Sequence, residues 1–348
     1  MDGFVGRHGI RRLFCLVTYP LVLVAVSLAQ SSPDYGEAFQ EAMSKGRFAL
    51  AQRNFADAIK QFKKAVKASN EADWNAYLGL TTAYFRMGDL KEVKSVAHKL
   101  VELASDDQHR AEAHAVLGLA FYADRKKKEN LTLAEAEFRT AQQSDPSFPD
   151  PYFNIGKILL EQGKDEEGIE WLRKFLELAP KGSANEESRR LIAKPELARA
   201  DRAPNFVGAS QDGQPIELAA FRGRIVLLDF WATWCKPCEE AIPDIERLAH
   251  TFPEDQLVIL SISVDDVESD WRKYVIRRKM NWPQCRDQQY RIYESMRLRP
   301  AGQYSVPAYV LLNPDGVVLG RFINDISIAD IKKKIEAELQ KALEVPAK

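Results

Sequence analysis

The sequence predicts two domains of different fold class, an all-α solenoid of helical repeats followed by an α/β domain with a central mixed sheet flanked by helices. Residues 35–200 are rich in Ala, Leu, Glu and Lys, and their apolar positions recur at three and four residue steps, as in consecutive amphipathic helices. Residues 203–343 instead alternate short apolar runs with helical segments, which is typical of a sheet covered on both faces. A chain of 348 residues is long enough to bury two cores.

The overall composition excludes two broad classes of protein. Lys and Arg total 49 against 50 Asp and Glu, so the formal net charge is -1 and no basic field is available to gather phosphates. We therefore expect no nucleic-acid partner. With 28% charged residues the chain is also too polar for a protein that crosses a membrane many times.

Residues 1–29 have the pattern of an export signal. Arginines within residues 7–12 precede the apolar run 13–28, which ends in small residues suited to cleavage after Ala29. The run contains Pro20 and is shorter than the roughly 20 residues that span a bilayer. We expect an exported protein, in the periplasm or cell envelope if the source is bacterial. An uncleaved anchor is the alternative, and only then would the protein be attached to a membrane.

The helical half resembles the tetratricopeptide repeat (TPR), whose period is about 34 residues. In that repeat, small residues let two helices pack closely while aromatic residues fill the gaps between them. The clearest matches are Gly118 with Phe138 in a third repeat and Gly156 with Pro180 in a fourth. Residues 185–200 are expected to form a solvating cap helix that Pro195 bends or ends. The resemblance implies an all-α TPR domain over residues 35–200.

The repeats have two alternative roles. They could serve only as a spacer or as a contact between two copies of the chain. Alternatively, their concave face could be a groove that binds a peptide or protein, because its register brings together aromatic and hydrogen-bonding side chains. The residues assigned to this groove are Phe85, Arg86, Tyr122, Asn154 and Lys157.

The second half contains strand and hairpin signals in a regular order. Apolar runs bounded by turn residues such as Asp212-Gly213 indicate strands and tight turns. The expected elements are a hairpin over 206–218, strands over 224–230 and 257–264, a hairpin from 309–312 and 317–322, and a final helix over 327–343.

A pair of cysteines, Cys235 and Cys238, lies between the strand expected over 224–230 and a helix. A lone C-x-x-C could be half of a zinc site, but zinc needs four ligands. The remaining candidates, Cys285 and five scattered His, provide no second close pair, so we expect no metal. With the preceding strand, the flanking tryptophans and the intervening proline, residues 203–343 resemble thioredoxin-fold proteins of the TlpA and ResA type. The resemblance implies a redox-active dithiol.

The spacing of the pair has a physical reason. Two intervening residues at the start of a helix place the sulfurs close enough to bridge, and the first sulfur lies over unpaired backbone N–H groups. Those groups and the helix dipole favour the thiolate, so Cys235 is expected to be the exposed nucleophile and Cys238 the resolving thiol. Lys236 should lower the pKa of the attacking sulfur further, and Pro237 fits the first helical turn because it needs no donor there. Trp234 is expected to contact substrate.

The resemblance also assigns roles to residues outside the pair. Asp229 matches the buried acid of thioredoxin, a candidate proton acceptor for Cys238, although a purely structural acid is the alternative. Pro307 matches the cis-proline that faces the dithiol. A cis bond before Pro307 would present the backbone of Val306 to an extended substrate. Cys285 fits no second motif, and a buried free thiol is favoured over a third redox partner.

These features predict a thiol-disulfide oxidoreductase that needs no cofactor beyond its own dithiol. Its expected partners are protein thiols or disulfides and an unidentified electron donor or acceptor; the resemblance favours a reductive task. A scaffold protein with a regulatory redox centre is one alternative. A thiol peroxidase is a weaker one, because Ala232 and Leu228 occupy the places of the Thr and Pro that peroxiredoxins use.

Overall fold

The computed structural model describes residues 35–125, 127–181, 184–299, 302–323 and 327–344. The chain divides into two compact units between Arg199 and Ala200. The segment interpreted as an export signal lies outside the described residues. Within the described ranges, no helix is both long and apolar enough to cross a membrane.

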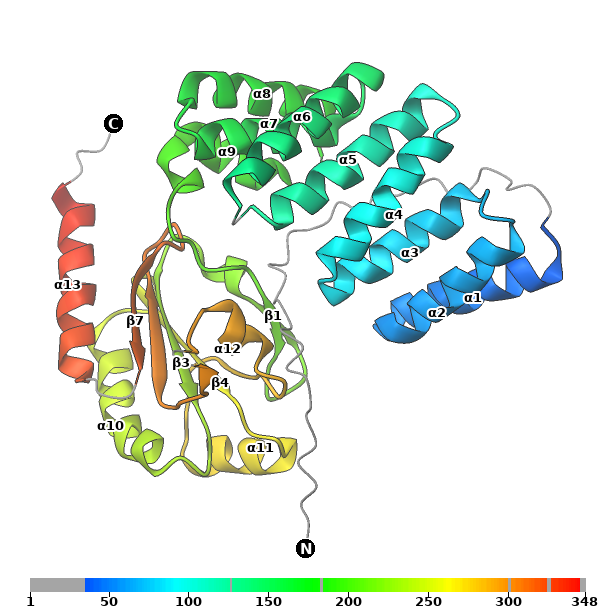
Figure 1. Cartoon of the computed structure of the whole chain (residues 1–348). Coiled ribbons are helices and arrows are strands. Elements are labelled where there is room, and N and C mark those ends of the chain that lie inside the picture. Colours follow the sequence, from blue (N-terminus) through cyan, green and yellow to red (C-terminus); the bar gives the residue numbers. More distant parts are fainter. Residues whose placement is uncertain (1–34, 126, 182–183, 300–301, 324–326, 345–348) are drawn as a thin grey trace, which may run out of the picture. The chain divides into compact units, whose positions relative to one another are not determined.

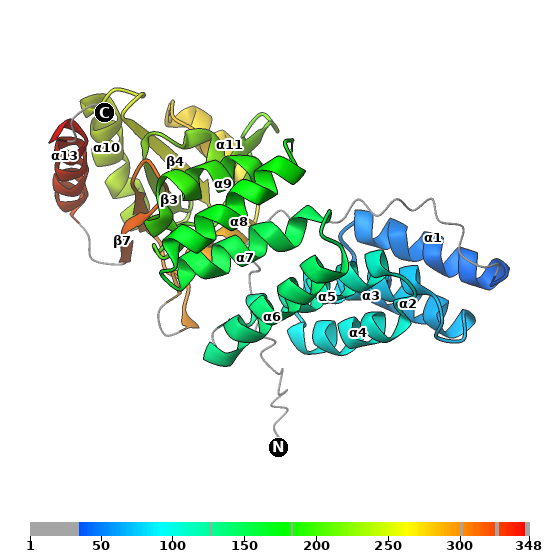
Figure 2. The same ribbon diagram turned by 90° about the horizontal axis from the view of Figure 1, so that it is seen from above.

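The first unit consists of helices that pack against their neighbours in chain order, drawn from blue to green in Figure 1 and seen from above in Figure 2. Eight of them form four consecutive pairs, as in TPR repeats, and a ninth follows the last pair. Their bounds are α1 Glu37–Ala51, α2 Phe55–Ala68, α3 Trp74–Met87, α4 Leu90–Leu103, α5 Asp107–Ala123, α6 Lys128–Ser144, α7 Pro149–Glu161, α8 Asp165–Leu178 and α9 Ala184–Ala193.

Capping residues set where several of these helices begin. Asn54, Asp73, Asp89 and Asp106 each accept a hydrogen bond from the backbone N–H three residues later, which satisfies one of the donors left open at a helix start. Gly88 ends α3 in the left-handed conformation, with a φ of 77°. The repeat boundaries are therefore encoded locally.

Small residues hold the paired helices close together, as the repeat pattern predicted. A Cβ atom added at Gly118 would lie 2.9 Å from the ring of Phe138, and one at Gly46 would lie 2.8 Å from the ring of Phe62. Both phenylalanines are buried. The expected cap helix is α9, and Pro195 opens a short 3₁₀ turn, η1 Pro195–Ala198, after α9 has ended.

The second unit is built on a five-stranded mixed sheet in the order β5-β4-β3-β6-β7. β4 and β5 run parallel to β3, whereas β6 pairs antiparallel with β3 and β7 pairs antiparallel with β6. A separate hairpin, β1–β2, precedes the sheet. The bounds are β1 Val207–Ala209, β2 Pro215–Glu217, η2 Leu218–Phe221, β3 Ile225–Trp231, α10 Lys236–Thr251, β4 Leu257–Ser263, α11 Glu268–Arg277, β5 Gln284–Arg286, α12 Arg291–Ser295, β6 Ala308–Leu312, β7 Val318–Ile323 and α13 Ile328–Glu344.

Both faces of this sheet are covered, which confirms the predicted fold class (Figure 1). On β3, alternate residues point to opposite faces. Ile225 and Leu227 pack with side chains of α10 and α13, whereas Leu228 and Phe230 pack with α12 on the other face. Asp229 belongs by this alternation to the α10 face, in the centre of the sheet.

Candidate active site

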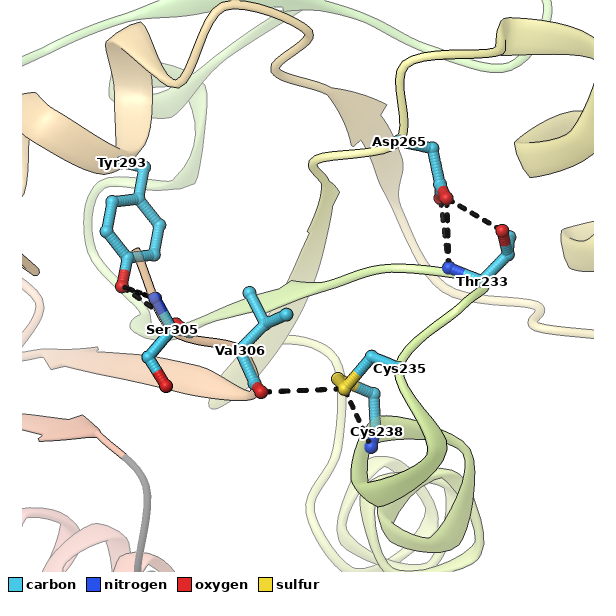
Figure 3. Close-up of a disulfide and its surroundings, with 7 residues drawn as sticks. All are labelled: Thr233, Cys235, Cys238, Asp265, Tyr293, Ser305 and Val306. Carbon is cyan, nitrogen blue, oxygen red and sulfur yellow. Dashed lines mark hydrogen bonds between the residues drawn. A yellow bond between two sulfur atoms is a disulfide. The ribbon is translucent and has the colours of Figure 1, made fainter. Parts of the chain in front are cut away.

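The two cysteines form a disulfide at the start of α10, with 5.2 Å between their Cα atoms (Figure 3). Cys235 is the N-cap of the helix, and its Sγ accepts a hydrogen bond of 3.2 Å from the backbone N–H of Cys238. Pro237 occupies the first turn, as expected. The sulfur of Cys235 therefore lies where the open donors and the positive end of the helix dipole stabilise a thiolate.

The side chain of Cys235 is less exposed than the sequence suggested. Cys235 is only 5% exposed and Cys238 3% exposed in this oxidised state. The cause is the loop that faces the pair, because the carbonyl oxygen of Val306 lies 3.5 Å from Cys235 Sγ. Exposed surface beside the disulfide comes from Trp234, which is 64% exposed, and from Lys236 and Pro237.

The peptide bond between Val306 and Pro307 is cis, in agreement with the prediction from the motif. Ser305, which precedes Val306, is fixed by hydrogen bonds to a tyrosine that the sequence analysis did not identify. The hydroxyl of Tyr293 donates to the carbonyl of Ser305 at 2.7 Å and accepts from its N–H at 3.1 Å (Figure 3). Tyr293 is fully buried on α12. Both backbone groups of Ser305 are thus occupied, and Val306 is the residue of this loop that faces the disulfide.

A second anchor fixes the loop that enters the motif. Asp265 accepts hydrogen bonds from the backbone N–H of Thr233 at 3.1 Å and from its hydroxyl at 2.7 Å, and a further one from the hydroxyl of Ser263 at 2.6 Å. Trp231 and Ser263 are paired at the ends of the parallel strands β3 and β4, so residues two positions beyond them meet at one sheet edge. That register is the signal from which Asp265 could have been found.

Asp229 is a buried carboxyl whose neighbours are known. It is 5% exposed, and its Oδ2 accepts a hydrogen bond of 2.7 Å from the hydroxyl of Ser261, which itself accepts one from Trp282 Nε1 at 2.8 Å. Burial raises the pKa of Asp229 to about 6, partly offset by the Ser261 hydrogen bond. The carboxyl is therefore poised near neutral pH, on the sheet face that α10 covers.

Cys285 lies away from this site. It is fully buried on the edge strand β5, in the cluster on the α12 face of the sheet. Burial, followed by the charge of Asp287, raises the pKa of its thiol to about 12. A Cβ atom added at Gly208 would lie 2.9 Å from its Sγ, so the hairpin packs directly on it. The structure agrees with a buried free thiol.

The groove residues assigned in the helical unit are mostly not open surface. Phe85, Tyr122 and Lys157 are all buried, at 9%, 4% and 6% exposure, although a binding anchor needs accessible area. The hydroxyl of Tyr122 donates to Glu161, and Lys157 Nζ lies 5.5 Å from the centre of the Tyr122 ring. These contacts take up the side chains that we expected to face a ligand.

The other two assigned residues differ from each other. Asn154 donates its side-chain N–H to the carbonyl of Asp150 in its own helix, whereas Arg86 is exposed. Of the five, Arg86 keeps the exposure that a groove residue requires.

No set of three or more His, Cys, Asp or Glu side chains that could hold a metal ion occurs among the described residues. The chemistry that this site supports rests on the dithiol. A helix-terminal disulfide facing a cis-proline, with a buried acid in the adjacent central strand, defines the class of thioredoxin-fold thiol-disulfide oxidoreductases.

Comparisons with known proteins agree with this class. The AhpC/TSA family profile matches residues 200–321, and tetratricopeptide repeat profiles match residues 49–118 and 149–181. The thiol-disulfide oxidoreductase ResA of Bacillus cereus is 30% identical over 148 residues, which are 42% of this chain and 80% of the relative. ResA of Bacillus thuringiensis is 31% identical over 139 residues, covering 40% of this chain and 75% of the relative.

Among solved structures, a thiol:disulfide interchange protein of the thioredoxin family from Chlorobium tepidum is similar at 25% identity, with a TM-score of 0.36. That match covers 40% of this chain and 97% of the other. From the sequence relatives, the chain belongs to the ResA family of thiol-disulfide oxidoreductases, and it carries TPR repeats in its first half.

Proposed function

We propose that this protein is an exported reductant of disulfides in other proteins, and that its TPR unit recruits those proteins. The observation that carries the proposal is the contact of Cys235 with the carbonyl of Val306 on the cis-proline loop. A partner chain that pairs with the Val306 backbone would bring its own disulfide to this sulfur. Trp234, exposed beside the pair, supplies apolar surface for the same partner.

The reaction transfers two electrons from the dithiol to the partner. The thiolate of Cys235 attacks one sulfur of the partner disulfide, forms a mixed disulfide and releases the other partner sulfur as a thiolate. Cys238 then gives its proton to Asp229, and its sulfur attacks Cys235. This second step closes the Cys235–Cys238 disulfide and releases the second partner thiol. An external thiol reductant must restore the dithiol.

The surroundings of the two cysteines support attack by Cys235 and resolution by Cys238. The N–H of Cys238 and the helix terminus stabilise the anion of Cys235, so that thiol needs no separate base. Cys238 is one turn inside the helix and buried, and it needs an acceptor for its proton. A carboxyl whose pKa is raised to about 6 is mostly ionised at neutral pH and still basic enough to take a proton.

The direction of transfer is tested by the reduction potential of the pair. Equilibration of the full chain with glutathione buffers gives it, from the fraction of alkylated cysteines. A value near about −270 mV, as for thioredoxin, supports a reductant, whereas one near about −120 mV would mean an oxidant.

Recruitment by the repeats is tested by trapping. A Cys238→Ser protein should accumulate mixed disulfides through Cys235, because no second sulfur resolves them. If the repeats raise the local concentration of partners, a bait that begins at Asp201 should trap fewer proteins and less selectively, while its reaction with a small disulfide stays nearly unchanged. Identical trapped sets from both baits would reduce the repeats to a spacer or a contact between copies.

Export is supported by the pattern of residues 1–29. Fractionation of cells expressing the full chain tests it, since retention of the protein in the cytosol would contradict export.

A scaffold with a regulatory dithiol would show no turnover of protein disulfides. Peroxidase chemistry is disfavoured, because Ala232 and Leu228 are buried and offer no hydroxyl for a peroxide.

A further inference from the structure

A cavity of about 600 Å³ opens beside the disulfide, on the α10 face of the sheet. It extends from Pro237 and Pro307, which flank the two sulfurs, along α10 and the first turn of α13. One water needs only about 10–15 Å³ of such space, so the cavity admits many. Solvent therefore reaches the interior of this unit close to the reacting pair.

One buried polar side chain lines this cavity without a hydrogen-bond partner of its own. Tyr309 on β6 is 2% exposed, and its hydroxyl makes no hydrogen bond to any other residue that the structure describes. Its oxygen is not among the fully enclosed polar atoms without a partner in the described part of the chain, so it borders open space. The cavity that Tyr309 lines is large enough for a water molecule to bind this hydroxyl.

Tyr309 is also the cross-strand neighbour of the buried acid. Asp229 pairs with Ser261 on one side and with Tyr309 on the other. Directly opposed residues of antiparallel strands carry their side chains on the same face, with Cβ atoms about 5 Å apart. Ser261 already donates to Asp229. Tyr309 is therefore next to the carboxyl on the same face of the sheet and also lines the cavity. Burial, followed by the charge of Asp229, raises the pKa of the Tyr309 phenol.

We propose that the hydroxyl of Tyr309, through cavity water, connects Asp229 to solvent: it stabilises the carboxylate and carries away the proton that Asp229 receives from Cys238. The inference rests on the proposed function, because it needs Asp229 as the acceptor in the resolving step. Tyr309 acts through Asp229 and is a positioning residue.

The proton balance of the step is complete. The Cys238 thiol loses its proton to the Asp229 carboxylate, and the sulfur closes the disulfide. The protonated acid then gives its proton to water as the Tyr309 hydroxyl donates one proton and accepts another, so the tyrosine is unchanged. The charged groups around this path are few: Asp244 and Arg247 of α10 pair with each other at the cavity, and Lys332 of α13 lines it too.

The test uses the reduced full chain and the chromogenic disulfide 5,5′-dithiobis(2-nitrobenzoate) in stopped flow. The first thionitrobenzoate released reports attack by Cys235, and the second reports resolution by Cys238. The variant is Tyr309→Phe, which removes only the hydroxyl. The matched control is Tyr274→Phe, a buried tyrosine of α11 whose hydroxyl faces Arg278 and not the cavity.

Tyr309→Phe should leave the first phase unchanged. Loss of the hydroxyl removes the water-mediated link to the carboxylate, so the pH midpoint of the second phase should rise by about one unit and its rate at pH 6, near the wild-type midpoint, should fall about fivefold. Tyr274→Phe should leave both phases and the pH midpoint at their wild-type values.

An unchanged pH midpoint of the second phase in Tyr309→Phe would overturn the inference, as would equal slowing of both phases, which indicates a structural defect. Failure of the proposed function looks different. In that case the wild type itself would release thionitrobenzoate without a distinct second phase, or Asp229→Asn would resolve as fast as the wild type.

Discussion

Replacement of the buried acid by its neutral isostere, Asp229→Asn, should make the α/β unit more stable at neutral pH. Burial raises the pKa of this carboxyl from 3.8 to about 6 in the folded chain. Between these values the folded state holds a proton that the unfolded state has lost, so stability falls as pH rises. The shift is roughly two pH units at about 1.4 kcal/mol each, or about 3 kcal/mol in total.

The asparagine should keep the native contacts. Its carbonyl oxygen can accept the hydrogen bond from the Ser261 hydroxyl that Oδ2 of the acid accepts. At pH 3.5 the wild-type acid is protonated and the two proteins should be equally stable. At pH 7.5 the variant should be more stable by up to about 3 kcal/mol, because only the wild type must bury an anion.

The measurement is urea unfolding of the oxidised full chain at a series of pH values, followed by hydrogen exchange of the β3 and β4 amides, which reports on this unit alone. Ser261→Ala provides a perturbation of opposite sign. It removes the hydrogen bond that lowers the Asp229 pKa, so its stability should fall more steeply with pH than that of the wild type. Parallel stability curves for the wild type and Asp229→Asn from pH 3.5 to 7.5 would refute the assigned pKa.

Three further substitutions test the hydrogen bonds that fix the loops around the disulfide and one close helix–helix contact in the TPR unit. Tyr293→Phe removes both hydrogen bonds to Ser305 and should cost about 1–3 kcal/mol of stability and lower kcat/KM for protein disulfides more than for a small disulfide; equal losses on both substrates would contradict its role in shaping the cis-proline loop. Asp265→Asn cannot keep all its acceptor contacts and should slow the first thionitrobenzoate phase, because the loop before Cys235 loosens; an unchanged first phase would separate Asp265 from the motif. Gly118→Val should destabilise the TPR unit by about 1–3 kcal/mol in thermal unfolding through overlap with Phe138 and leave exchange of a small disulfide unchanged.

Features carried by local sequence were predictable. The strands around residues 224–230 and 257–264, both hairpins and the helix after the cysteines follow from hydrophobic runs and turn residues, and the structure has them within a few residues. The cis bond at Pro307 was implied by its motif and is present. In each case, the pattern that specifies the element lies within the element itself.

Features that depend on tertiary pairing were not predictable from one sequence. β5 spans only Gln284–Arg286 and exists because it completes the edge of β4. Tyr293 and Asp265 become part of the site only when distant backbone segments meet them. The predicted exposure of Phe85, Tyr122 and Lys157 was wrong for the same reason. Helical register predicts the face on which a residue lies, but it does not predict which neighbours cover that residue, as Glu161 does for Tyr122.

The burial of Cys285 has a practical consequence for anyone who handles the reduced protein. Of the cysteines in the described part of the chain, only Cys235 and Cys238 can react in the native fold at neutral pH, because the third thiol is fully enclosed and its pKa is raised to about 12. Within the described part of a Cys238→Ser chain, Cys235 is then the single reactive sulfur. A fluorophore, a spin label or an immobilising resin can be attached to this part of the chain at that one atom. The label then lies at Cys235, the sulfur that is proposed to react with partner proteins.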